Sequence, residues 1–215
     1  MAIEIAAQGS DAWHLLRMGK ATASRFSAIT RNKSDTDFGA GAYSYAYELA
    51  AERLTRVPAP SASSPATSHG HEFEPKARAA YSWATGRNVT TRGFVAHPSH
   101  EMAGASVDGV VEGEGGLVEI KCPFTSREHA RTLSRGAMPS RYVAQVQGQM
   151  WVTGSDWCDY VSYHPDFPAG LDLVYVRVAR NDDYIGSLSR RVVSFLDFVE
   201  TITGKCNAHS RERNG

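Results

Sequence analysis

Residues 103–122 contain the feature that most restricts how this chain can fold: two apolar, β-branched runs joined by a glycine-rich turn. The runs ASVDGVV and LVEIKC flank the segment EGEGG, a pattern typical of a β-hairpin. Residues two apart in a strand share a face, so Glu119 and Lys121 point to one side, while Val118 and Ile120 point to the other. Charged groups are costly to bury, so this pair needs an explanation.

Asp108 falls on the same face as this pair in either of two hairpin registers. If residues 113–114 form a two-residue loop, Asp108 lies opposite Glu119. If the loop is residues 114–115, Asp108 lies opposite Lys121. Opposed side chains are about 5 Å apart, so both registers bring the three charged groups together. A three-residue loop would separate them.

Two carboxylates this close repel each other unless a cation lies between them. Mg²⁺ suits such a site because it takes oxygen ligands and keeps several waters, and Mn²⁺ is an alternative. A protonated Lys121 cannot be a ligand, but it could position or deprotonate a water, or offset charge in a phosphoryl transition state. The face therefore predicts a metal-dependent hydrolysis site. The competing interpretation is an exposed ion pair between Glu119 and Lys121, worth less than about 1 kcal/mol.

Hydrophobic spacing and capping residues place several helices before the hairpin. Ser10 or Asp11 is expected to cap a short helix, and Ser24 a second one. The Pro/Ser-rich residues 58–68 are expected to form a loop, and Pro75 is expected in the first turn of the helix that follows.

The order of elements after the hairpin indicates the fold class. A helix is expected first, then two strands, then a long amphipathic helix, which closes the series of elements. This order predicts one α/β domain over residues 1–215, with a mixed central β-sheet and helices on both faces. The expected helix covers residues 139–154, the two strands cover 157–165 and 171–180, and the final helix covers 181–204.

Charge, cysteine count and hydropathy narrow the class of protein. Lys plus Arg number 23 and Asp plus Glu number 23, which argues against coating nucleic acid through bulk positive charge but leaves a local basic groove open. The three cysteines form no CxxC pair, so a reducing compartment is expected. No stretch resembles a signal peptide or a membrane span. We expect a cytoplasmic protein that does not enter a membrane.

A set of segments around the hairpin carries a resemblance to a known family. Together they resemble the phage lambda exonuclease family of alkaline exonucleases, also described as YqaJ-like viral recombinases, a branch of the PD-(D/E)xK nucleases. The resemblance runs from about Trp13 to the final helix, and the third and fourth segments below are highly specific as a pair. In chain order the segments are WHLLRMGKATASRFSAI, GHEFEPKARAAY, LVEIKCPFTSREH (preceded by GASVDG) and YVAQVQGQMWVTG.

The resemblance implies a PD-(D/E)xK nuclease-like core and a Mg²⁺-dependent exonuclease. Such an enzyme degrades linear double-stranded DNA from the 5′ end, releases 5′-mononucleotides and leaves 3′ single strands for phage-type recombination. It further implies a homotrimeric ring, a single-strand annealing recombinase as partner, and a phage or prophage origin in a bacterial host. A net charge of zero agrees with a ring, because bulk attraction could not hold DNA over many turnovers.

The resemblance also assigns roles to individual residues. Asp108 and Glu119 match metal ligands, together with the Ile120 carbonyl, and Lys121 matches the catalytic lysine. Glu74 matches a helix glutamate that faces the site. Three residues match those that hold a 5′ phosphate: Arg17, Ser24 and Ser106. Gln145 and Gln147 match two glutamines behind the site. Lambda exonuclease carries another acid upstream of its metal aspartate, and the matching place here lies near Pro98, with only His100 and Glu101 nearby.

The helical period divides the glutamines into two faces. At about 100° per residue, Gln145 and Gln149 share a face and Gln147 lies nearly opposite. We therefore favour Gln145 over Gln147 as a site residue, with a merely polar helix face as the alternative. Read singly, Arg17, Ser24 and Glu74 are more ordinary: a solvated arginine, a helix cap and an acid at a helix start.

Two other functions compete with the exonuclease. A PD-(D/E)xK endonuclease or resolvase would share the site chemistry but would also cut closed-circular DNA. A non-catalytic module that binds DNA ends would not need Asp108, Glu119 and Lys121 together. Release of mononucleotides on addition of Mg²⁺ would separate the exonuclease from this last possibility.

Overall fold

The structure is a computed structural model that describes residues 6, 8–30, 37–60 and 64–214. Its centre is a six-stranded sheet in the order β1-β3-β4-β5-β6, with β2 also paired to β3. β1 with β3 and β4 with β5 are parallel pairs, while the other pairs are antiparallel. The expected α/β fold with a mixed central sheet is confirmed. The strands are β1 (Ala21–Thr22), β2 (Val89–Ala96), β3 (Ala103–Val111), β4 (Gly116–Lys121), β5 (Trp157–Tyr163) and β6 (Leu173–Ala179).

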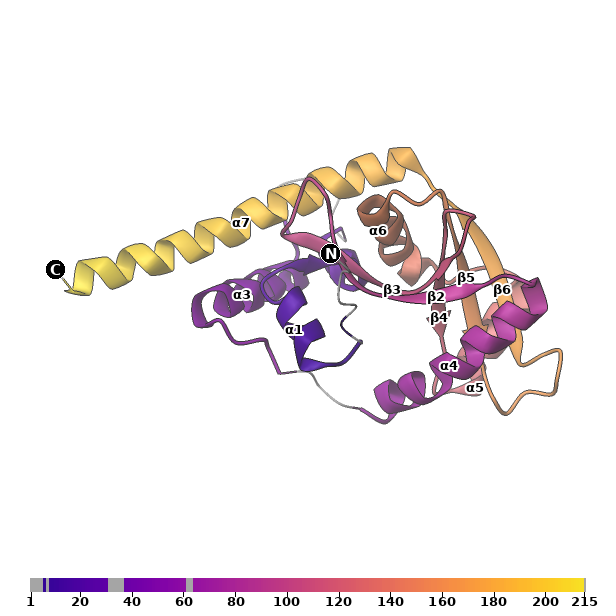
Figure 1. Cartoon of the computed structure of the whole chain (residues 1–215). Helices are drawn as coiled ribbons and strands as arrows, with labels where there is room; N and C mark the ends of the chain where they lie inside the picture. The colour runs from indigo at the N-terminus through magenta and orange to yellow at the C-terminus, as the bar shows by residue number, and fades with distance from the viewer. Residues whose placement is uncertain (1–5, 7, 31–36, 61–63, 215) are drawn as a thin grey trace.

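Helices cover both faces of this sheet (Figure 1). Helix α4 (Pro65–Thr85) packs on one face, while α6 (Val143–Thr153) and the start of α7 (Asp182–Asn214) pack on the other. Helix α7 continues past α3 and projects from the body of the molecule (Figure 1). The remaining helices are α1 (Asp11–Arg17), η1 (Ala23–Arg25), α2 (Phe26–Ile29), α3 (Ala40–Thr55), α5 (Ser126–Arg135) and η2 (Ser140–Tyr142).

The alternation of β4 determines which side chains enter which layer. Val118 and Ile120 join Tyr81 of α4 in one apolar cluster. Leu117, on the opposite face, joins Met150 of α6 in another. Both clusters consist of buried apolar side chains in contact, so they fix α4 and α6 against the two faces of the strand that carries the charged pair.

Two expectations at helix starts are wrong. Helix α4 begins at Pro65, with Ser64 as its N-cap, so residues 65–68 of the expected loop at 58–68 are helical. Pro75 lies in the interior of this helix and not in its first turn. Packing of the helix on the sheet compensates for the backbone hydrogen bond that Pro75 cannot donate. Ser24 is not a cap; it lies within η1, whose N-cap position is held by Thr22.

Sequence analysis also assigned no element to residues 126–135, which form helix α5. This helix is strongly polar and buries only His129 and Thr132, so it lacks the apolar stripe that usually reveals an amphipathic helix. His129 is held by Ser162 of β5 at 2.8 Å and by the Leu171 carbonyl at 2.8 Å. Helix α5 is therefore attached to the sheet by polar contacts.

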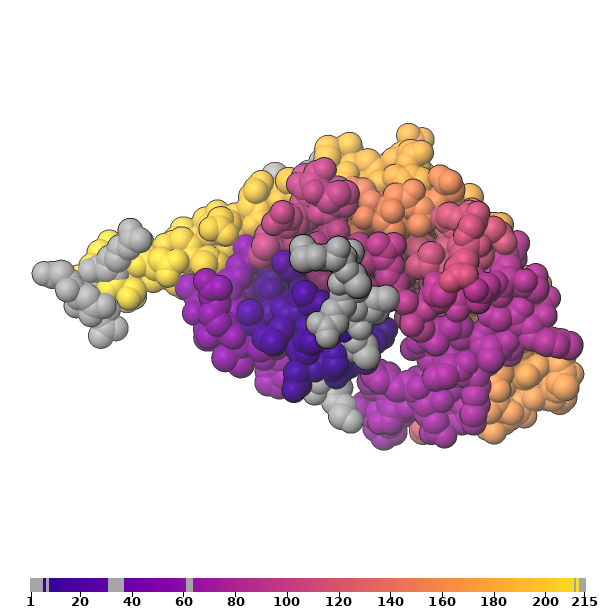
Figure 2. All heavy atoms as spheres, viewed as in Figure 1, coloured from indigo at the N-terminus to yellow at the C-terminus, as the bar shows by residue number. Residues whose placement is uncertain are grey.

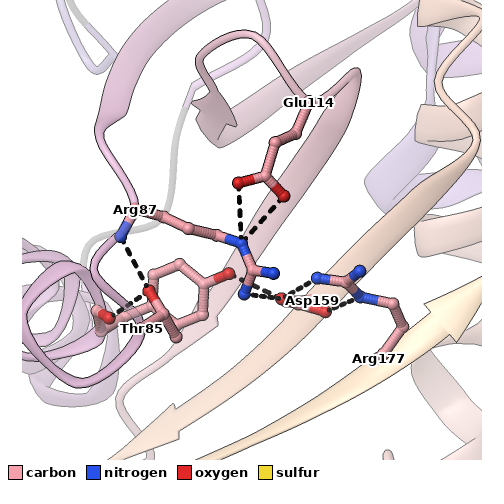
Figure 3. Close-up of polar contacts among 6 residues, drawn as sticks. Thr85, Arg87, Glu114, Asp159 and Arg177 are labelled. Carbon is pink, nitrogen blue, oxygen red and sulfur yellow. Dashed lines mark hydrogen bonds and ion pairs between the residues drawn. The ribbon is translucent and has the colours of Figure 1, made fainter.

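A buried carboxylate braces the far end of α4 against the sheet. Asp159 of β5 accepts two hydrogen bonds from Arg177 of β6 (2.8 and 2.9 Å) and one from the Tyr81 hydroxyl of α4 (2.6 Å). Arg87 bridges Asp159, at 3.8 Å, and Glu114 in the β3–β4 turn, at 3.0 Å (Figure 3). These contacts join α4, the hairpin turn, β5 and β6 into one unit.

Within the described part of the chain, no helix is both long enough and apolar enough to cross a bilayer. Cys122 and Cys158 are buried and Cys206 is exposed, and all three are free thiols. Burial raises the pKa of the Cys122 thiol to about 12, so it is an inert, protonated packing residue at neutral pH.

Candidate active site

Strand β3 changes its partner halfway along one edge. β2 pairs with it from Gly104 to Val111 and occupies the whole of the other edge. On the first edge, β1 pairs at residues 103–104 and β4 at residues 109–111. Residues 105–108 therefore lie at a gap in the sheet, where backbone groups are free to face side chains. Ser106 and Asp108 both lie in this gap.

The hairpin has the first of the two expected registers. Val111 pairs with Gly116 and Gly109 pairs with Val118, which continues to Asp108 opposite Glu119. The two-residue loop is wrong, because four residues, 112–115, connect the strands. Two of them, at positions 113 and 115, are glycines with positive φ (76° and 68°).

A β-bulge then turns Asp108 toward β4. Two residues of β3, Asp108 and Gly109, lie opposite the single Thr91 of β2. Gly109 is needed here because a Cβ would lie 2.4 Å from the Val89 side chain. The Asp108 carboxylate accepts a hydrogen bond from the Ile120 N–H at 2.8 Å, in place of a backbone ladder bond. Asp108 thus closes the gap beside Glu119 and Lys121.

Glu119 lies at the centre of a set of hydrogen-bond donors. Its side chain is 1% exposed. Lys121 Nζ lies 2.5 Å and Gln145 Nε2 2.6 Å from one carboxylate oxygen, while Gln149 Nε2 lies 2.5 Å from the other. Gln149 Nε2 also reaches the Ser106 carbonyl at 3.1 Å. Helix α6 therefore fixes both Glu119 and the open edge of β3.

The charges of the site do not balance. Burial, reinforced by Glu119, raises the pKa of the Asp108 carboxyl well above its ordinary value, with Lys121 acting in the opposite sense. Burial alone would lower the pKa of the Lys121 ammonium, but Glu119 and Asp108 more than offset it and raise that pKa. Without a further cation, one ammonium group is thus shared between two buried carboxylates.

Glu74 enters the same region from α4. Arg78, one turn later, lies 2.5 Å from the Glu74 carboxylate and donates to the Asp108 carbonyl at 3.1 Å. Burial raises the pKa of Glu74, and Arg78 counters part of that effect. Arg78 therefore links α4 to the bulged strand; sequence analysis missed it, although its i,i+4 spacing from Glu74 was a usable signal.

Glu74, Asp108 and Lys121 line a hollow of about 300 Å³ between α4, the end of β4 and the start of α6. Figure 2 shows the surface hollowed between the N-terminal part of the chain and α4. Tyr142 lies at its wall, with Lys121 Nζ 5.2 Å from the ring centre and the Tyr160 ring 5.4 Å away. The charged side chains of the hollow are Glu74, Asp108, Lys121, Glu128 and Arg141.

Two of the three expected phosphate-holding residues meet. Arg17 and Trp13 of α1 both donate to the Ser106 hydroxyl, at 3.0 and 2.9 Å, and the Arg17 guanidinium lies 4.0 Å above the Trp13 ring. Burial lowers the pKa of Arg17. An arginine guanidinium nevertheless stays charged in proteins. Ser24 contacts Thr22 at 3.3 Å and is not hydrogen-bonded to this group.

Gln145 and Gln147 go to different places. Gln145 reaches Glu119, whereas Gln147 donates to the Ala179 carbonyl at 2.9 Å and accepts from the Asn181 N–H at 2.9 Å. Gln147 therefore secures the connection between β6 and α7. Gln149, four residues after Gln145, is the additional glutamine at the site, as their shared helix face indicated.

The donor chemistry fits a hard divalent cation. Asp108, Glu119 and the Ile120 carbonyl offer oxygen atoms of the kind that Mg²⁺ prefers, and the deficit of positive charge around the two acids favours a bound cation. Among the described residues, no three acidic, cysteine or histidine side chains converge on one point. Waters would therefore have to complete the shell of a cation held here, which suits Mg²⁺.

Comparison with known sequences identifies a family. Residues 12–156 match the family described as the YqaJ-like viral recombinase domain. An uncharacterized protein of Acanthamoeba polyphaga mimivirus is 33% identical over 105 residues, which are 43% of this chain and 19% of that protein. The uncharacterized protein YqaJ of Bacillus subtilis is 23% identical over 158 residues, 73% of this chain and 48% of YqaJ. The chain thus aligns with less than half the length of either relative.

A solved structure resembles nearly the whole chain. The alkaline exonuclease LHK-Exo from Laribacter hongkongensis is 34% identical, with a TM-score of 0.86 over 94% of this chain and 99% of that one. LHK-Exo has also been solved in complex with dAMP, and that structure matches at 35% identity with the same TM-score and coverage.

Proposed function

The chain belongs to the YqaJ-like viral recombinase family, and from this membership we propose that it is a DNA exonuclease acting in recombination. More specifically, we propose a Mg²⁺-dependent enzyme that digests linear double-stranded DNA from the 5′ end and releases 5′-mononucleotides. The observation that carries the proposal is the buried, charge-deficient group of Asp108, Glu119 and Lys121 at the gap in the sheet. Similarity to LHK-Exo, an alkaline exonuclease, supports it.

The residues divide the work as follows. Asp108, Glu119 and the Ile120 carbonyl would hold the cation, which when bound supplies Lewis-acid stabilisation of charge on the phosphate. The surrounding carboxylates favour the ammonium form of Lys121, so we assign it to donating hydrogen bonds to the attacking water or the developing negative charge. Gln145 and the neighbouring Gln149 keep Glu119 in place, which in turn orients Lys121.

Helix α1 supplies the proposed contact to the DNA end. Arg17 reaches Ser106, which lies two residues before Asp108 on the same strand. An arginine can make paired, charge-assisted hydrogen bonds to a terminal phosphate. A 5′ phosphate held by Arg17 would therefore set the register of the next phosphodiester against Asp108, and each cut would regenerate the same ligand. Ser24 remains a candidate on the neighbouring η1, 3.3 Å from Thr22.

Assembly and partners are part of the same proposal. We propose a closed homotrimer that acts with a single-strand annealing recombinase in the cytoplasm of a bacterial host, encoded by a phage or prophage. Exposed apolar side chains on α1 and α3, including Leu15 (56%) and Tyr47 (60%), give the chain surfaces on which copies could pack. Light scattering that shows only monomer at micromolar concentration would contradict the ring.

The direct test is digestion of linear duplex DNA labelled at either the 5′ or the 3′ end. We expect Mg²⁺-dependent release of labelled mononucleotide from the 5′-labelled end first, no release with a chelator, and no cutting of a covalently closed circle. Lys121→Ala should be inactive, while Lys205→Ala on the projecting part of α7 should behave as wild type. Cutting of the closed circle would indicate an endonuclease, and binding of ends without release would indicate a binding module.

A further inference from the structure

Three histidines from three different elements meet in one aromatic cluster beside the candidate active site. His69 belongs to α4, His129 belongs to α5, and His164 directly follows β5. The ring centre of His164 lies 6.0 Å from that of His69 and 6.1 Å from that of His129. The cluster therefore joins α4, α5 and the connection between β5 and β6. Phenylalanine rings pack against the imidazoles: Phe73, Phe124 and Phe167.

The three imidazoles differ in how their nitrogen atoms are bonded. Both nitrogens of His129 are engaged, one by the Ser162 hydroxyl and the other by the Leu171 carbonyl. In His69 and His164, by contrast, the Nε2 atom is buried and has no hydrogen-bond partner among the residues that the structure describes. A buried polar atom without a partner costs about 1–3 kcal/mol, so these two nitrogens need an explanation.

The spacing of the two rings fits a shared metal ion. Imidazole is the commonest metal ligand in proteins, and its nitrogen lies about 2.0–2.1 Å from a bound Zn²⁺. With bonds of this length, two imidazoles that share one ion have ring centres about 5–6.5 Å apart. The ring centres of His69 and His164 are 6.0 Å apart, and their planes are inclined at 47°. The pair is thus spaced as two ligands of one ion.

His164 has the surroundings that a metal ligand needs. It is 3% exposed, and burial lowers its pKa, which favours the neutral form that binds metals. A metal on Nε2 requires the ring proton on Nδ1, where a carboxylate usually accepts it. The Asp166 carboxylate lies 4.0 Å from Nδ1 on an 86% exposed side chain. It is therefore free to replace the Asp166 N–H, which now donates to Nδ1 at 3.3 Å.

The donor set and the open space beside it indicate the kind of metal. Two nitrogen donors suit Zn²⁺, Ni²⁺ or Cu²⁺, whereas Mg²⁺ prefers oxygen. His164 and Asp166 line an open hollow of about 540 Å³ at the start of α5, through which an ion and its waters can enter. No third acidic, cysteine or histidine side chain of the described residues completes the group. Waters would fill the remaining positions, which is the arrangement of an open site and not of a closed structural one.

We propose that His69 and His164 hold a divalent transition-metal ion of the zinc class through their Nε2 atoms. The ion joins α4 to the connection between β5 and β6, and it steadies the part of α4 that precedes Glu74. This site is separate from Asp108 and Glu119 and takes a different class of metal. It does not depend on the proposed exonuclease function.

The test is calorimetric titration of Zn²⁺ into the full chain carrying Asp108→Ala, which removes the other candidate metal site. The same titration is made after adding His69→Phe or His164→Phe, each of which keeps an aromatic ring in the cluster. His209→Phe, at an exposed histidine on the projecting part of α7, is the matched control. Imidazole NMR signals of the Asp108→Ala protein, with and without Zn²⁺, give a second readout that needs no further substitution.

We expect one Zn²⁺ per chain, with binding unchanged by His209→Phe. Binding should weaken by at least about tenfold in His69→Phe and in His164→Phe, since loss of even a supporting partner of a ligand has an effect of this size. Zn²⁺ should shift the imidazole signals of His69 and His164 together. Absence of Zn²⁺ binding, equal affinity in His69→Phe, or shifts confined to other histidines would each overturn the inference and leave a bridging water as the partner of the two nitrogens.

Discussion

Two groups of buried carboxylates lie on neighbouring strands of this sheet and differ in how their charge is balanced. Asp159 on β5 has two guanidinium groups and a tyrosine hydroxyl around one carboxylate. Asp108 and Glu119, at the β3–β4 gap, share one ammonium group, with Glu74 close by. A balanced buried charge needs nothing more, whereas a charge-deficient one is a standing electrostatic cost that a cation would remove.

This difference in charge balance distinguishes a structural network from a candidate active site. The residues of the Asp159 network join four elements and line no hollow described above, and protein groups donate its hydrogen bonds (Figure 3). Asp108 and Lys121 of the other group line a hollow, and that group stays deficient in positive charge. If this contrast holds, changes at Asp159 will alter stability with little effect on chemistry, and changes at the other group will do the reverse.

The largest effect is expected at Lys121. Lys121→Ala should reduce turnover on linear duplex by about 100-fold or more, because the ammonium group acts on the transition state more than on bound substrate. Binding of DNA ends should change little. Single-turnover digestion and a filter-binding assay measure the two quantities, with Lys205→Ala as control. A variant that keeps more than a tenth of wild-type turnover would remove Lys121 from the chemistry.

Asp159→Asn should act in the opposite way. The substitution keeps the shape of the side chain but removes the charge and one acceptor that Arg177 and Tyr81 share. We expect the free energy of unfolding to fall by about 1–3 kcal/mol, with turnover per folded molecule close to wild type. Urea denaturation with activity measured on the same samples checks this. Unchanged stability together with lost turnover would place Asp159 in the catalytic group instead.

A smaller effect is expected at Arg17. Arg17→Ala should reduce the preference for 5′-phosphorylated over 5′-hydroxyl ends by about tenfold, so that the two rates converge. Rates on matched duplexes that differ only in the terminal phosphate give the ratio. Arg92→Ala, which removes an exposed arginine of β2, serves as the control. If Arg17→Ala keeps the full wild-type ratio, Arg17 does not hold the phosphate.

Much of this contrast was visible in the sequence. Alternation along β4 was sufficient to put Glu119 and Lys121 on one face, and the glycine-rich turn limited Asp108 to two registers. The helical period alone joined Gln145 to Gln149 and separated Gln147. These predictions succeeded because each depends on one element and its own period.

The rest depends on contacts between elements. The bulge at Asp108 lies in the β2–β3 pair, where Val89 approaches Gly109, and no local pattern encodes this contact between strands. Helix α5 is attached through His129, a contact with residues more than thirty positions away. The start of α4 was predictable in principle, since Ser64 followed by proline is a usual cap, but the Pro/Ser-rich composition favoured a loop.

The most direct test of the account is thermal unfolding with and without Mg²⁺, applied to both carboxylate groups. Without metal, Asp108→Ala should melt at or above the wild-type temperature, because a like charge has been removed. Glu119→Ala should melt lower, because the buried donors around Glu119 lose their acceptor. At a 100-fold excess over its dissociation constant, Mg²⁺ should stabilise wild type and Asp159→Asn by about 2.7 kcal/mol and leave Asp108→Ala and Glu119→Ala unmoved. An equal Mg²⁺-induced rise in all four proteins would show that the cation does not bind at Asp108 and Glu119, and would contradict the account.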